Sequence, residues 1–449
     1  MNILVLNLPS KKKVIRRYNC SYHANGFYYP NQELLRAATI LKKKHNVHYI
    51  DSQVNPEISD IKSITHFIDK NNISLVISMF SLEFINSDYE KIKNIKEKTD
   101  INVVGIGYIL SLYPNRYPEV DIILDNFFEE KLYDSLSGKN LLEELRKNKD
   151  KQYKRNPDII KRVDRSFINS KDYSELFSHG KTAFLYFGFG CPYKCNYCIS
   201  AYNLNQYNLR NKEYIFNELR YLHKKNYKNV RILDDNFNIN IDFLKDLNRF
   251  LMKNDFKFNF YALSRTDRLD KNLIDIYSQL NVKRLYVGLE SLNESLLDYY
   301  NKNGDYLKLK ENFSYLKNKN IEIGLWLLFN SLNETKNTFL SQIPRLRKLK
   351  PDFINLSILK PYPNTLFYKK NKSKINLDSN PENLTFKDKY VKIRNPALFE
   401  LITLIKFYSH PIMFFKFLKM FFMYPITFFK LFFIFIKSIF KLDERNDLL

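Results

Sequence analysis

The sequence predicts an α/β protein in which an open parallel sheet comes first, a partial barrel of parallel strands follows, and a helical tail comes last. Three observations predict this order: alternating β-type and helical segments over residues 1–135, a second such series over 181–370, and a change of composition beyond 371. A chain of 449 residues also calls for two or three domains, because a single core rarely grows so large.

The N-terminal segment contains short apolar runs that are typical of buried strands. They cover residues 2–9, 46–51, 73–80, 102–107 and 120–125. Between them, residues 31–45 and 87–99 have helical spacing with lysine-rich outer faces. Because strands that alternate with helices form a parallel sheet, we expect a Rossmann-like domain over residues 1–135.

Residues 136–180 are polar and have no sustained periodicity, which predicts a connector between domains. Six further strand-like runs follow it. They begin near residues 182, 229, 258, 284, 321 and 353. Six strand–helix repeats predict a partial (β/α)6 barrel, short of the eight that close a full one, with its chemistry at the C-terminal ends of the strands.

The final segment, residues 371–449, is predicted to be a basic, aromatic helical tail. From Leu401 to Leu442 it has six lysines and no acidic residue among many Phe, Ile, Leu and Met, and its longest uncharged stretches of about ten residues are too short to span a bilayer. Five lysines share one narrow arc of an ideal helix: Lys416, Lys419, Lys430, Lys437 and Lys441. A Phe-rich face opposite such a stripe is typical of a helix in a membrane interface, although Pro425 interrupts the register.

The net charge does not identify a binding partner, whereas the cysteine content indicates a cellular compartment. The net charge of +24 suits nucleic acid, anionic lipid or solubility alone, and composition does not choose among them. The chain has only four cysteines, and three of them lie within eight positions, so a disulfide framework is not expected. This cysteine content is typical of a protein of the reducing cytoplasm. Cys20, in a loop after the first strand, is interpreted as a buried or incidental thiol.

The clustered cysteines, Cys191, Cys195 and Cys198, have the spacing C-x3-C-x2-C just after the first barrel strand. A structural zinc site needs four ligands, and His179 and His223, the nearest histidines, are distant in sequence. Three thiolates suit a 4Fe-4S cluster that leaves one iron open to a small molecule. A zinc or incidental thiol site stays the alternative.

This motif and several others resemble the radical S-adenosylmethionine (SAM) enzymes that carry an N-terminal cobalamin-binding-type domain, whose members include hopanoid methylases and the anaerobic Mg-protoporphyrin ester cyclase. The matching stretches, in the family's order, are GCPYKCNYC, LRNKEYIFNEL, ILDDNFNIN, LSRTDRLDKNLI, YVGLESLNESLLDYYNK, LLFNSLNETKNT and LKPYPNTLFY. The resemblance covers residues 1–370. Asn330 and Asn364 stand where the family has glycine, and asparagine tolerates left-handed turns best among the other residues.

The resemblance implies a cofactor set and a first group of site residues. Cys191, Cys195 and Cys198 would hold a 4Fe-4S cluster whose open iron binds the amine and carboxylate of SAM, and Tyr197 is the aromatic residue before the last cysteine. In the family, the reduced cluster cleaves SAM to a 5′-deoxyadenosyl radical, which abstracts a hydrogen from the substrate. The electron donor would be a flavodoxin or ferredoxin.

Four charged residues complete the implied site. Asp234 and Asp235 are expected to face the SAM amine or the substrate, and a solvated turn is the alternative. Arg265 and Glu290 are expected to bind the SAM carboxylate and ribose, with ion pairs that only order the strand ends as the alternative.

Cobalamin is a possible further cofactor. The sequence has no Asp-x-His-x-x-Gly motif, only Gly105 and Gly107 match the usual Gly-Gly turn, and Phe127 and Phe128 would crowd the nucleotide tail. Bound cobalamin, substrate binding and a structural role therefore all stay open.

The leading hypothesis is a cytoplasmic enzyme at the inner membrane face that modifies an unactivated carbon of a hydrophobic, lipid-like substrate. Methylation is favoured if cobalamin binds, and oxidation, cyclisation or coupling if it does not. An RNA-modifying enzyme similar to the methylthiotransferases is less favoured, because those carry a second cluster on N-terminal cysteines and an RNA-binding β-barrel. A non-catalytic scaffold is the third hypothesis, and the intact cysteines argue against it.

Overall fold

The computed structural model describes residues 1–18, 21–24, 27–203, 206–302, 304–332, 334–376, 384–425 and 429. It divides into an N-terminal unit, residues 1–175 and 208–218, and a barrel unit, residues 176–207 and 219–449. The segment expected to be a connector, 136–180, lies mostly in the N-terminal unit, and the tail belongs to the barrel unit. Cys20 and three lysines of the predicted stripe, Lys430, Lys437 and Lys441, lie outside the described residues.

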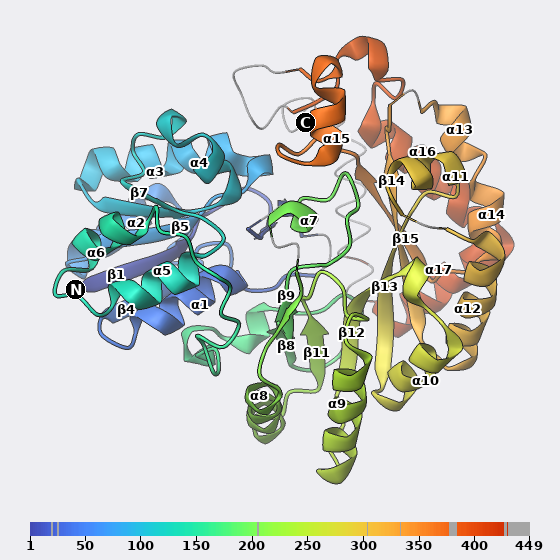
Figure 1. Ribbon diagram of the computed structural model, residues 1–449, viewed down its shortest axis with the longest axis horizontal. Helices are drawn as coiled ribbons and strands as arrows, with labels where there is room; N and C mark the ends of the chain where they lie inside the picture. The colour runs from blue at the N-terminus through green and yellow to red at the C-terminus, as the bar shows by residue number, and fades with distance from the viewer. Residues whose placement is uncertain are drawn as a thin grey trace. The chain divides into compact units, whose positions relative to one another are not determined.

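The N-terminal unit is built on a five-stranded parallel sheet of order β4-β1-β5-β6-β7, which confirms the predicted open sheet (Figure 1). Its strands are β1 (Asn2–Asn7), β4 (Asn46–Asp51), β5 (Leu75–Met79), β6 (Asn102–Ile106) and β7 (Ile122–Leu124). Its helices are α1 (Gln32–Leu41), α2 (Ile61–Lys70), α3 (Ile85–Thr99), α4 (Tyr108–Leu112), α5 (Phe128–Ser135) and α6 (Leu141–Asn148). The short strand β10 (Asn208–Leu209) also falls within the residues of this unit.

Local sequence explains where these helices start. The side chain of Asn31 accepts a hydrogen bond from the backbone N–H of Leu34 at the start of α1, and Asp60 forms a capping box with Ser63 at the start of α2. The central strands β1 and β5 are mostly apolar and almost entirely buried because helices cover the sheet on both faces (Figure 1).

A short antiparallel hairpin follows β1, and the sequence patterns did not predict it. Its strands are β2 (Val14–Arg16) and β3 (Ser21–His23). Strands of three residues are too short for a period of two to be recognised. The hairpin matters because it brings Arg16 to the C-terminal edge of the sheet, as described below.

The barrel unit has a six-stranded parallel sheet of order β15-β14-β13-β12-β11-β8, which confirms the partial barrel (Figure 1). Its strands are β8 (Thr182–Leu185), β11 (Asn229–Ile232), β12 (Asn259–Arg265), β13 (Val282–Glu290), β14 (Glu322–Phe329) and β15 (Phe353–Ile358), with a short β9 (Gly188–Phe189) after β8. Its helices are α7 (Ser200–Asn203), α9 (Ile241–Lys253), α10 (Lys271–Gln279), α11 (Glu294–Tyr299), α12 (Tyr306–Asn318), α13 (Lys336–Leu340), α14 (Ile343–Lys348) and α15 (Leu366–Asn371), and α8 (Lys212–Lys224) crosses the boundary between the units.

The tail forms two helices, α16 (Pro396–Tyr408) and α17 (Pro411–Met423), bent by 99° at Ser409 and His410. The predicted segment is therefore interrupted well before Pro425, because Pro411 lacks the N–H that would continue α16. Among the described residues no single helix is long and apolar enough to cross a membrane, whereas α16 and α17 taken together meet that test by length and composition.

Candidate iron-sulfur and cofactor site

The three clustered cysteines lie in one loop after β8 and β9, in the barrel unit. Gly190, at φ +85°, opens the loop in a conformation that favours glycine. The N–H of Cys198 donates to the carbonyl of Cys195 at 3.2 Å, and Cys195 is buried while Cys191 and Cys198 are half-buried. Burial first, and then the charges of Asp235 and the other two cysteines, raise the pKa of Cys198 to about 12. The loop therefore brings the three sulfurs into mutual electrostatic range.

The chain from the end of α11 holds this loop in place. The N–H of Asn196 donates to the carbonyl of Tyr300 at 3.0 Å, and the side chain of Asn301 donates to the carbonyl of Lys194 at 2.8 Å. On the other side, the N–H of Phe367 donates to the carbonyl of Asn196 at 2.9 Å. Residues of the YYNK motif thus hold the cysteine loop in place through hydrogen bonds.

Arg265, the last residue of β12, contacts the cysteine loop directly. Its Nη1 donates to Sγ of Cys195 at 2.9 Å, while Nε and Nη2 donate to the two carboxylate oxygens of Asp267 at 2.9 and 2.8 Å. The guanidinium also lies over the ring of Tyr193, 4.3 Å from its centre. All three guanidinium nitrogens therefore contact groups of the chain itself.

Glu290 and Tyr197 form a second connection to the loop. Glu290, at the end of β13, accepts a hydrogen bond from Nζ of Lys302 at 2.8 Å and another from the hydroxyl of Tyr197. A Cβ at Gly288 would lie 2.7 Å from Oε1 of Glu290 and 3.1 Å from Nζ of Lys302, so a larger residue there would displace the pair. Glu290 itself has φ +68°, a strained conformation that its two partners help to hold.

The two aspartates after β11 have different surroundings. Asp234 is buried and accepts hydrogen bonds from the N–H of Phe187 at 2.8 Å, the N–H of Gly188 at 3.0 Å and the hydroxyl of Tyr207 at 2.8 Å. Asp235 is half-buried, and its charge raises the pKa of both Cys191 and Cys198, so it is the aspartate closer to the cysteines. Asp234 therefore orders the backbone between β8 and β9, and Asp235 lies within electrostatic range of the cysteine loop.

The Asp234 contacts predict a specific pH dependence of stability. Burial raises the pKa of Asp234 to about 7, although its three hydrogen bonds oppose the shift. An unfolded aspartate has a pKa of about 3.9. Between about pH 4 and pH 7 the folded protein therefore binds this proton more strongly than the unfolded chain does. The free energy of unfolding falls by up to about 4 kcal/mol as the pH rises through this range. In the Asp234→Asn variant, the free energy of unfolding is not expected to show this decrease between about pH 4 and pH 7.

Urea unfolding followed by the fluorescence of Trp326, the single tryptophan, reports on the barrel unit, since Trp326 is in β14. Asp255→Asn, at a highly exposed side chain, is the matched control and should keep the wild-type pH profile. An Asp234→Asn profile that also follows the wild type would contradict this role of Asp234.

Buried asparagines at the strand ends are site candidates that the sequence motifs did not identify. Asn236 is 1% exposed, and neither its Oδ1 nor its Nδ2 has a partner among the described residues. Asn238 donates to Oγ of Ser264 at 3.1 Å, and its Oδ1 is likewise unpaired there. Buried amides are nearly always paired, so Asn236 marks a place for a ligand or an ordered water. Its only sequence signal was a position next to the Asp pair.

Asn330 and Asn364 behave as the sequence predicts for residues that replace glycine. Both have φ +65°, in the left-handed region. Asparagine occupies this region at lower cost than other side chains, so the turns after β14 and before α15 survive the substitution.

The three thiols fit a 4Fe-4S cluster better than a closed single-ion site. Among the residues that the structure describes, no three Cys, His, Asp or Glu side chains converge as the ligands of one ion would. A four-iron cluster takes each thiolate on a different iron, so its ligands are spread over the cluster, and with three of them one iron stays open. Cys191, Cys195 and Cys198 are the residues that would hold it.

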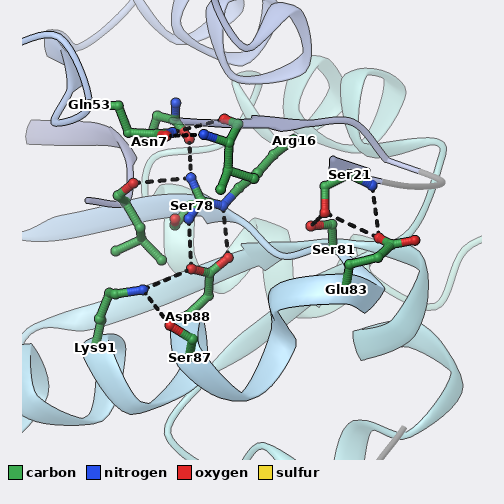
Figure 2. A network of polar contacts seen from close by, with 12 residues as sticks. Asn7, Arg16, Ser21, Gln53, Ser78, Ser81, Glu83, Ser87, Asp88 and Lys91 are labelled. Carbon is green, nitrogen blue, oxygen red and sulfur yellow. Dashed lines mark hydrogen bonds and ion pairs between the residues drawn. The ribbon is translucent and has the colours of Figure 1, made fainter. Parts of the chain in front are cut away.

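The C-terminal edge of the N-terminal sheet is occupied by the unit's own side chains (Figure 2). In this strand order ligands bind at the switch point between the first and third strands, here β1 and β5. Arg16 lies there with a side chain that is 0% exposed. It donates to both carboxylate oxygens of Asp88 at 2.8 and 2.7 Å, and to Oδ1 of Asn7 and the carbonyl of Leu8 at 3.0 Å each.

The two glycines expected to admit a nucleotide tail are packed in the same way. A Cβ at Gly105 would lie 2.6 Å from Leu110 and 2.7 Å from Val120, and a Cβ at Gly107 would lie 2.3 Å from the carbonyl oxygen of Phe80. Phe128, the first residue of α5, is buried in the hydrophobic core of the unit. These residues fit one another rather than cobalamin, and no step of the proposed function is assigned to cobalamin.

This packing predicts that the protein does not retain cobalamin. When the chain is produced with added cobalamin and purified anaerobically, we expect its spectrum to lack corrin absorbance, because Arg16 and its partners fill the switch point. Stoichiometric corrin in the purified protein would show that this edge opens to a ligand, contrary to the packing described.

Comparisons with known protein families agree with the site in the barrel unit. The sequence pattern of the Radical SAM superfamily matches residues 185–339, which contain the cysteine loop. The anaerobic magnesium-protoporphyrin IX monomethyl ester cyclase of Synechocystis is 23% identical over 215 residues, which is 46% of this chain and 42% of the cyclase. The tRNA-2-methylthio-N(6)-dimethylallyladenosine synthase of Karelsulcia muelleri is 22% identical over 72% of this chain and 69% of the synthase. The chain thus spans less than half the length of the Synechocystis cyclase.

Two solved structures share the fold of most of this chain. The radical SAM methyltransferase TsrM from Kitasatospora setae is 15% identical, with a TM-score of 0.67 over 90% of this chain and 88% of its own. The cobalamin-dependent SAM radical enzyme OxsB is 16% identical, with a TM-score of 0.58 over 89% of this chain and 66% of its own. At these identities the likeness establishes the fold alone.

Proposed function

We propose that this chain, a radical SAM enzyme that uses a 4Fe-4S cluster and SAM, modifies an unactivated carbon of a hydrophobic, lipid-like substrate. The observation that carries the proposal is the loop of Cys191, Cys195 and Cys198, which follows the first strand of a parallel barrel within the matched region. A cluster bound there supplies the electron with which SAM is cleaved, and the enzyme needs an external reductant, for which we propose a flavodoxin or ferredoxin.

The residues around the loop divide into contact and positioning roles in this proposal. Asp235, whose charge acts on Cys198, is suited to accept a hydrogen bond from the SAM ammonium, and the unpaired amide of Asn236 is suited to a polar group of SAM or substrate. Asp234, Glu290 and Arg265 engage the chain itself, so we assign them to positioning the loop and the strand ends. Tyr197 joins this group through its hydrogen bond to Glu290.

The surface of the tail helices supports a hydrophobic substrate. One side of α16 and α17 is buried in the barrel unit through Phe399, Phe407 and Met413. The remaining surface exposes large apolar side chains, here called the tail face: Leu398, Ile402, Ile405, Ile412, Phe414, Phe415, Phe422 and Met423. Lys406 and Lys419 are exposed beside them. Apolar side chains with flanking lysines suit an anionic lipid surface, so we propose peripheral docking there.

Not every lysine of the predicted stripe is available for such docking. The ammonium of Lys416 donates to the carbonyls of Lys350 and Pro351 at 2.5 and 3.0 Å. Partial burial lowers the pKa of Lys416 to about 8. Lys416 therefore attaches α17 to the barrel unit, and of the described stripe residues Lys419 is the one exposed to an anionic surface.

The substrate class can be tested by hydrogen abstraction without knowing the substrate. Cells grown in deuterated medium are separated into lipid and water-soluble extracts, and each is given to the reduced, cluster-loaded enzyme with unlabelled SAM. We expect deuterium to enter 5′-deoxyadenosine from the lipid extract only. Incorporation from the water-soluble extract alone would contradict a lipid-like substrate and leave the radical chemistry intact.

The same reactions distinguish methylation from oxidation. A SAM molecule that gives up its methyl group becomes S-adenosylhomocysteine, so methylation requires this product in proportion to the modified substrate. Because the packing at the switch point of the N-terminal sheet does not favour bound cobalamin, oxidation, cyclisation or coupling is the leading reaction, and methylation is the alternative that the likeness of the fold to TsrM keeps in view. Deuterated 5′-deoxyadenosine without S-adenosylhomocysteine would instead indicate oxidation, cyclisation or coupling.

RNA modification is the second candidate, because the similarity to the Karelsulcia synthase extends over 72% of this chain and the net charge is +24. Binding of unfractionated transfer RNA between 50 and 200 mM salt tests it. Tight binding that weakens steeply with salt would favour this candidate, since phosphate contacts release counterions.

A further inference from the structure

We propose that Arg265 is a positioning residue that sets the reduction potential of the cluster through its hydrogen bond to Sγ of Cys195. This inference rests on the proposed function only in that Cys195 ligates iron. It replaces the role in binding the SAM carboxylate that the motif implied for Arg265, and the contacts of the guanidinium carry it.

The guanidinium is held so that one N–H points at the sulfur. Asp267 takes Nε and Nη2 in a two-point contact at 2.9 and 2.8 Å, which fixes the plane of the group. Tyr193, two residues beyond Cys191, covers one face at 4.3 Å. Nη1 is left to donate to Sγ of Cys195 at 2.9 Å, and Arg265 is only 9% exposed, so water does not replace this contact.

A donor in this position has a predictable electrostatic consequence. Adding one electron makes a cluster and its thiolates more negative, so a hydrogen bond and a positive charge at a ligand sulfur stabilise the reduced state more than the oxidised one. Arg265 therefore raises the reduction potential of the cluster relative to a site without it. Its charge is permanent, and the effect persists at every physiological pH.

Arg268 provides a matched control in the same place. Its guanidinium lies over the same Tyr193 ring at 5.0 Å, and no hydrogen bond from it to a cysteine sulfur is found among the described residues. Replacing Arg268 removes a positive charge near the loop but leaves the contact with Cys195. A difference between the two arginines thus separates the hydrogen bond from general charge.

The experiment is a potentiometric titration of the reconstituted full-length protein, with the reduced cluster followed by electron paramagnetic resonance and iron and sulfide measured in parallel. We expect Arg265→Gln to bind iron as the wild type does and its potential to become more negative. A tenfold loss in the reduced-to-oxidised ratio at a fixed potential corresponds to about 59 mV for one electron. Asp267→Asn loosens the guanidinium but also removes a negative charge, so its shift should be smaller than that of Arg265→Gln, and Arg268→Gln, which removes charge without the hydrogen bond, should also shift the potential less than Arg265→Gln does.

An Arg265→Gln protein with a full cluster and the wild-type potential would overturn the proposal, as would an equal shift in Arg268→Gln. If Arg265→Gln does not take up iron, Arg265→Lys decides, since a lysine at this site cannot contact Asp267 at two points and Cys195 together, and an unshifted potential refutes the role. If no variant at 265 or 267 loads iron, the contact is structural and the proposal fails. A wild-type chain that itself binds no cluster would instead refute the proposed function.

Discussion

Cys195→Ser is expected to lose the cluster, from about four irons per chain to fewer than one, and to make no 5′-deoxyadenosine above background. The loop supplies three thiolates and, among the described residues, no fourth cysteine to replace a missing one. A serine hydroxyl is a poor ligand for iron in such a cluster, so the open coordination site and the cluster are lost together. Anaerobic reconstitution followed by iron and sulfide assays measures the effect.

Cys20→Ser is the matched control, because Cys20 is the one cysteine outside the motif. It should load iron and cleave SAM as the wild type does. A Cys195→Ser protein with a complete cluster, or a Cys20→Ser protein without one, would contradict the assignment of the loop. Circular dichroism of both variants shows whether the barrel unit stays folded.

Replacing Phe415 and Phe422 together with aspartate is expected to weaken binding to anionic vesicles by about a hundredfold or more. Their exposed fractions are 68% and 75%, among the highest of the large apolar side chains described. Burying one such side chain contributes about 1.5–3 kcal/mol, so losing two removes about 3–6 kcal/mol before any charge repulsion. Cosedimentation with vesicles of phosphatidylglycerol and phosphatidylcholine measures the change.

A pair of equally exposed apolar residues away from the tail face supplies the control. Met252 in α9 and Leu307 in α12 are 72% and 76% exposed, and their replacement by aspartate should leave vesicle binding within about threefold of the wild type. Equal losses in both double variants would attribute binding to general hydrophobicity or charge. Undiminished binding of the Phe415, Phe422 variant would refute docking through the tail face.

The parallel sheets and the cysteine loop were predictable because they rest on local patterns. Strands such as 75–79 are mostly apolar and buried along their whole length, and the helix predicted over residues 31–45 begins at Asn31, a residue type that caps helices. The cysteine motif and the glycine-replacing asparagines are likewise readable from spacing and residue type. Fold class and the metal-binding residues could therefore be proposed from sequence.

The contacts that assign roles were not predictable, because they join residues far apart in the chain. Arg265 contacts Cys195, 70 positions away, and Arg16 contacts Asp88, 72 positions away. The hydrophobic periodicity of a local segment carries no information about such contacts. The break before Pro411 had a local signal, but the hydrophobic pattern across it is continuous. Polar contacts depend on side-chain direction in the folded chain, which residue type alone does not determine.

The most direct test of the account is cleavage of SAM by the wild-type chain. The protein is reconstituted anaerobically to about four irons, reduced with dithionite and given SAM, and 5′-deoxyadenosine is quantified with time by mass spectrometry. The account predicts its steady formation, dependent on reductant and absent from Cys195→Ser. A fully loaded, reduced cluster that yields no 5′-deoxyadenosine would contradict the central claim that this loop supports radical chemistry.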